Sequence, residues 1–381
     1  MHDLILRRGR LLDPGRGINQ LGDVAFSAGR ISGIGEEVAG AQAAVERDVE
    51  GSFIVPGLID LHTHVYWGGT SLGVDAGRVA RASGTTTFVD AGSAGPGNFA
   101  GFLRHVIEPS VPRILAFLNI SFAGVFGFSG SVMVGECADL RLLDAREALR
   151  VARENLATIV GIKVRVGRIA GGSSGMAPLE MAIEVAEELS LPVMAHIDLP
   201  PPNLCQILKR LRPGDILTHC FRPFPNAPLV GGRIREEAVL ARERGVIFDV
   251  GHGMGSLSFA TAIGMMEQGF FPDVISSDVH ALCIDGPAYD LLVTLSKFLA
   301  MGMPLGDLVE RVTLRPAGAV RQPELGRLQT GGLGDATVLA IEEGAYTYLD
   351  CTGEKMISQR RLVCKGCVLA GAFLPVEPRD A

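Results

Sequence analysis

Residues 53–64 read FIVPGLIDLHTH, an apolar run that ends in two histidines separated by one residue. The run Ile54–Leu61 predicts a buried β-strand. Because alternate residues of a strand point to one face, His62 and His64 are expected to lie side by side at its carboxyl end. Two neutral imidazoles directed at one point indicate a transition-metal site, although an isolated pair of this kind also occurs on half-buried strand edges.

The chain then repeats an alternation of strands and helices. Stretches with helical spacing separate the short β-rich runs, for example Ala145–Ala157, Leu179–Leu189, Arg235–Arg244 and Ser258–Gln268. This alternation indicates parallel strands with crossover helices, and eight such units predict an α/β fold, a (β/α)8 TIM barrel over residues 53–323. The expected strands are Ile54–Leu61, Thr85–Val89, Arg113–Ile120, Ile159–Val164, Pro192–Ala195, Asp215–Thr218, Val246–Val250 and Val274–Ser277.

Both ends of the chain have a different texture. Residues 1–52 hold short alternating runs that are broken by turn signals such as Asp13-Pro14-Gly15. Residues 324–381 repeat this style, with β-rich runs at Ala336–Ile341 and Leu362–Leu369. We therefore expect the two ends to meet as one small β-sandwich beside the barrel.

The composition is that of a well-buried globular enzyme, since 47% of the 381 residues are hydrophobic and 20% are charged. The formal net charge is −7 and no basic stripe is present, which argues against nucleic acid as a partner. The amino terminus does not resemble a signal peptide, and no apolar run has the length needed to cross a bilayer. We therefore expect no membrane partner.

Seven cysteines without regular spacing favour reduced thiols and a cytoplasmic location. Cys364 and Cys367 form the one CxxC pair. A zinc ribbon needs a second such pair, so we interpret these residues as part of a carboxyl-terminal strand.

Polar residues occupy the carboxyl ends of the expected strands, where barrel enzymes place their chemistry. Four of the eight histidines of the chain fall in these positions. Along the chain the residues are His62, His64, Lys163, His196, His219 and Asp278.

Lys163 is the unusual member of this set because a lysine ammonium keeps its proton until about pH 10.4 and cannot bind a cation in that form. It follows the apolar run 158–162, where an unpaired ammonium would be costly to bury. From the residues alone, Lys163 could pair with an acidic neighbour or face outward at the barrel edge.

On these motifs the sequence resembles the amidohydrolase superfamily, the binuclear metal hydrolases that include dihydroorotase, hydantoinase and phosphotriesterase. The resemblance covers nearly the whole chain. It is strongest to a dihydroorotase-like or deacetylase-like branch, whose members hydrolyse acetylated small acids. The segments that carry it are PGLIDLHTH (56–64), IKVR (162–165), AH (195–196), THC (218–220) and SSDVH (276–280).

The resemblance implies two divalent metal ions. Zn²⁺ suits the mixed nitrogen and oxygen ligands, and manganese or iron could occupy the same site. By the resemblance, His62, His64 and Asp278 bind the more buried ion. His196 and His219 bind the more exposed one.

The implied bridge between the ions is Lys163, carboxylated by CO2 so that the amine becomes an anionic ligand. The implied reaction is hydrolysis of an amide or ester carbonyl by a hydroxide held between the ions. Asp278 is the implied catalytic residue, which accepts a proton during attack and returns it to the leaving group.

Further residues are candidates for contact with the substrate. Arg165 offers a cation to a substrate carboxylate, with a surface ion pair as the alternative. His252 lies between glycines after the seventh strand, which lets backbone approach a ligand, and its alternative is a loop histidine without a task. Residues 121–135, rich in glycine and phenylalanine, are expected to form an apolar wall, a lid or a subunit contact. The remaining candidates are Tyr66, Asn119, His280 and Tyr289.

We therefore predict a metal-dependent hydrolase that cleaves an amide or ester of a small acidic molecule, an N-acetyl or O-acetyl acid, and that forms homo-oligomers. The alternatives are a cyclic amidase, such as a dihydroorotase or hydantoinase, and a non-catalytic scaffold of the same fold. Dihydroorotases carry an arginine two residues after the paired histidines, where this chain has Tyr66. Retention of all six ligand positions argues against a scaffold.

Overall fold

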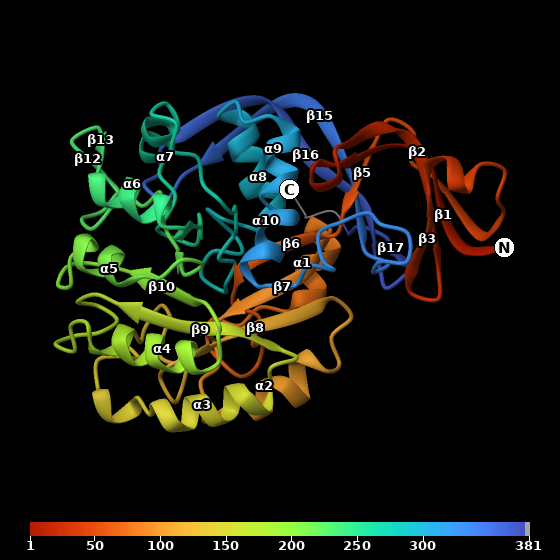
Figure 1. Ribbon diagram of the computed structural model, residues 1–381. Helices are drawn as coiled ribbons and strands as arrows, with labels where there is room; N and C mark the ends of the chain where they lie inside the picture. The colour runs from red at the N-terminus through yellow and green to blue at the C-terminus, as the bar shows by residue number, and fades with distance from the viewer. Residues whose placement is uncertain (378–381) are drawn as a thin grey trace.

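The computed structural model describes residues 1–377, which form two large β-sheets from different parts of the chain. One sheet is parallel and curled, with the strand order β14-β11-β10-β9-β8-β7-β6. Its strands are β6 (Leu58–Thr63), β7 (Thr85–Ala91), β8 (Arg113–Asn119), β9 (Ile159–Val166), β10 (Val193–Ile197), β11 (Ile216–Leu217) and β14 (Ile247–Phe248). Helices pack on the outside of this sheet (Figure 1).

Segment 274–279 contacts both edges of the parallel sheet. Val250 N donates to Val274 O at 3.1 Å on the β14 side, and His64 N donates to Val279 O at 3.0 Å on the β6 side. The eighth expected strand therefore lies where the sequence predicts it, but it forms isolated bridges instead of a regular ladder. The pairing brings Asp278 beside His62, whose carbonyl accepts from Asp278 N at 2.7 Å.

The helices of the described residues follow the strands in sequence. Asp144 caps α3 by accepting from the backbone N–H groups of Arg146 and Glu147, and the helix buries its apolar face against the sheet. The α-helices are α1 (Ala76–Ser83), α2 (Phe99–Phe102), α3 (Ala145–Glu154), α4 (Ala177–Glu188), α5 (Leu204–Arg210), α6 (Glu236–Glu243), α7 (Phe259–Met266), α8 (Leu291–Ala300), α9 (Leu305–Glu310) and α10 (Leu314–Ala319). None of them is long and apolar enough to cross a membrane.

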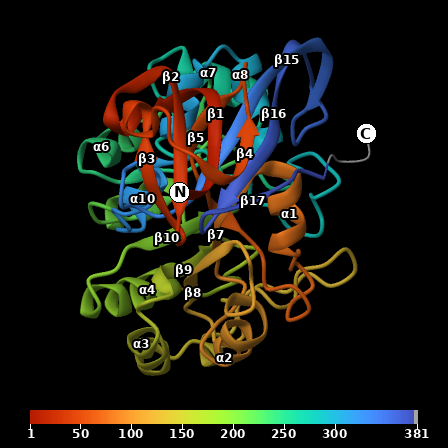
Figure 2. The same ribbon diagram turned by 90° about the vertical axis from the view of Figure 1, so that its right-hand side faces the viewer.

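The second large sheet combines both ends of the chain, as expected from their matching texture. Its order is β17-β16-β15-β5-β1-β2-β3, with β4 paired to β1. In Figure 2 the amino-terminal strands lie beside β15, β16 and β17. The strands are β1 (His2–Asp13), β2 (Ile18–Ser27), β3 (Arg30–Ile34), β4 (Ala43–Asp48), β5 (Phe53–Pro56), β15 (Ala336–Leu349), β16 (Lys355–Leu369) and β17 (Ala372–Leu374). A short hairpin, β12 (Leu229–Val230) and β13 (Arg233–Ile234), stands apart.

The single strand expected at Ile54–Leu61 is two strands in the structure. β5 pairs with β1 and β15 in the terminal sheet, whereas β6 pairs with β7 in the parallel sheet. The change of partner follows Pro56, which has no N–H to donate to a ladder. The chain thus passes from one sheet to the other immediately before the histidine pair.

Cys364 and Cys367 lie on β16, as interpreted from the sequence. Both are buried free thiols, and burial raises the pKa of each to about 12. The two cysteines therefore behave as small, buried apolar side chains of β16.

Candidate metal centre and active site

A cavity of about 40 Å³ lies at the carboxyl ends of the parallel strands. Every ligand position expected from the sequence lines it, together with Arg165 and His280. The strand ends therefore converge, as expected because parallel strands all end at the same edge of the sheet. The full lining is His62, His64, Leu72, Phe128, Lys163, Arg165, His196, His219, Asp278 and His280.

Three of these residues form a group that could hold a metal ion: His62, His64 and Asp278. Asp278 Oδ1 lies 3.3 Å from Nε2 of His62 and 3.3 Å from Nε2 of His64. That carboxylate oxygen is buried and has no hydrogen-bond partner in the described structure. A buried oxygen left in this state is unfavourable unless a cation or a proton satisfies it.

The outer nitrogen of His62 belongs to a short hydrogen-bond chain. Its Nδ1 lies 2.9 Å from Thr218 Oγ1, and that hydroxyl donates to Asp249 Oδ2 at 2.7 Å. Because the Thr218 hydroxyl donates its proton to Asp249, its oxygen accepts from His62, whose ring proton is therefore on Nδ1. Nε2 of His62 then keeps a lone pair that faces the cavity. Such outer partners orient histidines that bind metals.

His64 and His219 are held in the same way. Nδ1 of His64 lies 2.8 Å from Ser93 Oγ. Nδ1 of His219 lies 2.8 Å from Gly251 O, a carbonyl that can only accept, so this ring is also protonated at Nδ1. His196 completes the cluster, with its ring centroid 4.5 Å from that of His219.

Burial keeps these imidazoles in their neutral form. It lowers the pKa of His64 to about 3, and it lowers the pKa of His62, His196 and His219 well below the usual value. A neutral imidazole offers a nitrogen lone pair, which is the form that binds a metal.

Lys163 reaches the centre of the cluster from β9. Its neighbours Ile162 and Val164 pack in the outer apolar core, so strand alternation directs Lys163 inward. Nζ lies 3.3 Å from His62 Nε2 and 3.3 Å from Met194 Sδ. Burial lowers the pKa of this amine to about 8, which leaves a fraction of it unprotonated near neutral pH. Neither alternative for Lys163, an ion pair or an outward position, matches its contacts.

The donor set therefore fits divalent cations. It combines neutral imidazole nitrogens, an unpartnered carboxylate oxygen and a buried amine that can become anionic by carboxylation. Nitrogen and oxygen donors together suit zinc and its first-row neighbours.

Arg165 enters the same cavity two residues beyond Lys163. Its guanidinium stacks over the Phe128 ring, with Cζ 5.0 Å from the ring centroid, and its Nη1 lies 3.5 Å from Glu136 Oε2. Arg165 Nε and both Glu136 carboxylate oxygens lack hydrogen-bond partners. Arg165 thus retains donors that could bind an anion in the cavity.

His280 also lines the cavity, and its ring contacts both His64 and Phe128 edge to face. Leu282 N donates to its Nδ1 at 3.2 Å, so Nε2 carries the proton in the neutral ring. Burial lowers the pKa of His280 to about 4. The residue therefore offers a neutral N–H donor to the cavity.

Four of the candidate substrate contacts do not line the cavity. Tyr66 stacks on Phe102 at 4.6 Å, and its hydroxyl donates to Asn98 O. Asn119 is buried, with its amide bound to Gly92 O. The other two are His252, which is buried and bonded to Lys297, and Tyr289, in the loop before α8.

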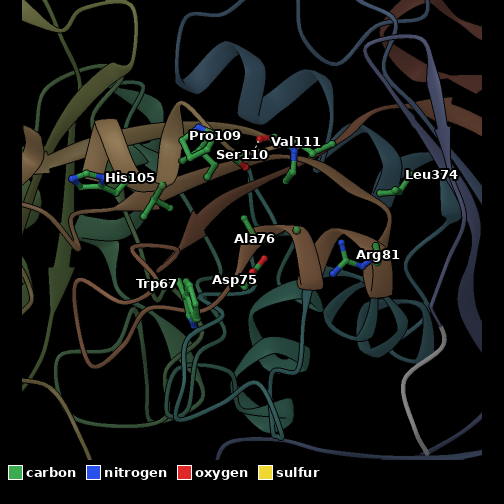
Figure 3. Close-up of a pocket in the computed structure, with 13 residues that line it drawn as sticks. Trp67, Asp75, Ala76, Arg81, His105, Pro109, Ser110, Val111 and Leu374 are labelled. Carbon is green, nitrogen blue, oxygen red and sulfur yellow. Dashed lines mark hydrogen bonds between the residues drawn. The ribbon is translucent and has the colours of Figure 1, made fainter. Parts of the chain in front are cut away.

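A larger pocket, of about 330 Å³, lies elsewhere on the molecule. Figure 3 shows Trp67, Asp75 and Arg81 on one side of it and the segment 105–111 on the other. Its lining includes one histidine, His105, and none of the expected ligands. The candidate site is therefore recognised by the convergence of donor atoms and not by the size of its cavity.

Sequence reasoning missed several residues around the site. Glu136 comes from the segment between β8 and α3, whose path no periodicity reveals. Phe128 belongs to residues 121–135, which were expected to form an apolar wall, a lid or a subunit contact, and it lines the cavity. Thr218 and Asp249 could have been predicted, because both lie near the carboxyl ends of expected strands and Thr218 precedes the candidate ligand His219. A search for hydroxyl and carboxylate partners of the histidines could have found them.

Comparison with known proteins gave no matching family model. A deacetylase of Agrobacterium fabrum (strain C58) is 36% identical over 330 residues, which are 86% of this chain and 80% of that protein. The crystal structure of a dihydroorotase superposes with a TM-score of 0.91 at 32% identity, over 99% of this chain and 100% of that chain. The crystal structure of an adenine deaminase has the same TM-score at 27% identity, over 98% and 100% of the two chains.

Proposed function

This chain belongs to the amidohydrolase superfamily of hydrolases, and from that premise we propose that it is a metal-dependent deacetylase of small acids. The substrate would carry an N-acetyl or O-acetyl group together with a carboxylate. The observation that carries the proposal is the meeting of the ligand positions and Arg165 in one small cavity. The similarity to a deacetylase supports the same reaction.

The proposed ligands are those that converge in the cavity. His62, His64 and Asp278 would bind one ion, and His196 and His219 the other. Lys163, carboxylated by CO2, would bridge them. Two bound cations, most simply Zn²⁺, would make a water acidic enough to attack near neutral pH and would polarise the substrate carbonyl.

The chain's own residues would orient the substrate and move the proton. Arg165 would bind the substrate carboxylate, and His280 would donate Nε2–H to a substrate oxygen. Asp278 would take a proton from the attacking water and return it to the departing nitrogen or oxygen. Water adds to the acetyl carbon, the C–N or C–O bond breaks, and acetate leaves with an amine or alcohol as the second product.

The finer architecture belongs to the same proposal. The curled sheet and segment 274–279 would make a closed (β/α)8 barrel of residues 53–323. Residues 1–52 and 324–381 would form a small β-sandwich domain, of which residues 378–381 lie outside the described residues. We further propose a cytoplasmic homo-oligomer, and the free thiols support a reducing compartment.

A cyclic amidase is the second candidate, favoured by the similarity to a dihydroorotase. Tyr66 argues against it, because this residue stacks on Phe102 and brings no cation to the cavity. A single screen of the zinc-loaded protein separates the two. We expect turnover of N-acetyl amino acids or acetylated hydroxy acids, in one chiral form, and none of dihydroorotate or hydantoins. Turnover confined to the cyclic amides would contradict the deacetylase.

A further inference from the structure

A buried lysine outside the cavity joins three separate segments of the chain. Lys297 lies on α8 and is fully buried. Its Nζ donates to His252 Nε2 at 2.7 Å, to Pro287 O at 2.6 Å and to Leu349 O at 2.7 Å. Three acceptors match the three hydrogens of an ammonium, which offsets the cost of its burial.

His252 links Lys297 to the backbone of the turn that contains it. Nδ1 lies 2.9 Å from the carbonyl oxygen of Gly253, so it carries the proton and Nε2 is left to accept from Lys297. The ring is fully buried and does not line the cavity. Its contacts hold the turn of residues 251–253 and leave it no access to a substrate.

That turn packs directly against the candidate ligands. A Cβ atom added to Gly251 would lie 2.9 Å from His219 Nδ1 and 3.0 Å from His62 Nδ1. One added to Gly253 would overlap the Asp278 carboxylate. Both glycines also have a φ of 49°, in the left-handed region.

A second set of contacts joins the same region to the antiparallel pair β15 and β16, the carboxyl-terminal hairpin. Leu349 ends β15, and the next residues contact the start of α7: Phe259 N donates to Asp350 Oδ2 at 2.9 Å, and Cys351 N donates to Leu257 O at 3.0 Å. In Figure 1 this hairpin extends from the terminal sheet across the helices as far as α7. Lys297 therefore lies where the hairpin, α8 and the ligand-contacting turn meet.

We propose that Lys297 and His252 are positioning residues that fix the turn 251–253 against His62, His219 and Asp278, and so set how firmly the centre retains its metal. The inference rests on the proposed metal centre. It assigns His252 a task different from substrate contact and gives the carboxyl-terminal hairpin a part in the active site.

The test compares three variants of the full-length, zinc-loaded chain: Lys297→Met, His252→Gln and Ser296→Ala. Ser296 neighbours Lys297 on α8 and accepts from Leu362 N of the hairpin at 3.0 Å, but it does not bond to the turn 251–253. The readout is the rate at which an excess of chelator removes zinc. Thermal melting is measured in parallel, because each variant loses a buried hydrogen bond.

Lys297→Met and His252→Gln are expected to release zinc about 10- to 100-fold faster than the wild type, because the loosened turn carries Gly251 O, the outer partner of His219 Nδ1. Ser296→Ala is expected to release it at the wild-type rate although its melting temperature falls. His252→Gln keeps an acceptor for Lys297 and decides the matter if Lys297→Met does not fold. Zinc release at the wild-type rate from folded Lys297→Met or His252→Gln would overturn this inference and leave the proposed function standing. Zinc release from Ser296→Ala as fast as from those two variants would do the same. A wild-type chain that takes up no zinc would overturn the proposed function together with it.

Discussion

Oδ1 of Asp278 lies 3.3 Å from Nε2 of His62, although the two residues are far apart in the sequence. His62 lies in β6, the first strand of the parallel sheet along the chain, and Asp278 follows β14, the last one. The backbone produces this approach, because Asp278 N donates to the His62 carbonyl where segment 274–279 meets β6. The same oxygen lies 3.3 Å from Nε2 of His64 and has no hydrogen-bond partner among the described residues. This geometry suits both proposed roles of Asp278, metal binding and proton transfer, and variants can separate the two.

Asp278→Asn is expected to retain most bound metal and to lose turnover by about 10²- to 10⁴-fold, because an amide cannot accept the proton. Its remaining oxygen can still face His62 and His64. Metal content and kcat of the same preparation check both statements. Turnover close to wild type would remove Asp278 from proton transfer.

Lys163→Ala is expected to lose both metal and activity, since it removes the proposed bridge. Short carboxylic acids added to the buffer should restore part of the activity by supplying the missing anion. Lys209→Ala, an exposed lysine on α5, is the control and should behave as the wild type. Full metal content in Lys163→Ala would contradict the bridge.

Arg165→Gln is expected to raise KM for an acetylated acid by roughly 10- to 100-fold, the effect of losing a hydrogen bond to a charged group. The matched control is the neutral amide of the same substrate, whose KM should change little. An equal loss for both substrates would mean that Arg165 maintains the cavity and does not bind the carboxylate.

Thr218→Val removes the hydroxyl between His62 and Asp249 with little change in volume. Metal affinity is expected to fall about 10- to 100-fold because the His62 ring loses its orienting partner. Thr294→Val serves as the control, since this buried threonine on α8 donates to the backbone carbonyl of Asp290 and does not line the cavity. Affinity is measured by competition with a chelator of known strength.

The convergence of the candidate ligands in one cavity could be predicted from the sequence because strand periodicity is strong and parallel strands end at one edge. Lys163 illustrates this, because its alternation with buried aliphatic residues along the strand is enough to direct its side chain inward. The paired histidines and Asp278 follow from the same rule.

The remaining features depend on contacts that no periodicity encodes. Phe128 and Glu136 reach Arg165 from an irregular segment, and the short ladders of β11 and β14 leave their strand ends weakly defined. Tyr66 was expected at the substrate, whereas in the structure its ring stacks on Phe102 and does not line the cavity. His252 lies in a turn that packs against candidate ligands, yet a lysine from α8 donates a hydrogen bond to its Nε2.

Elemental analysis of the purified, metal-loaded chain tests the metal centre most directly. With Lys163 intact we predict about two divalent ions per chain, as a bridged pair requires, with activity lost on chelation and restored by zinc. A fully active protein that contains no metal would contradict the account.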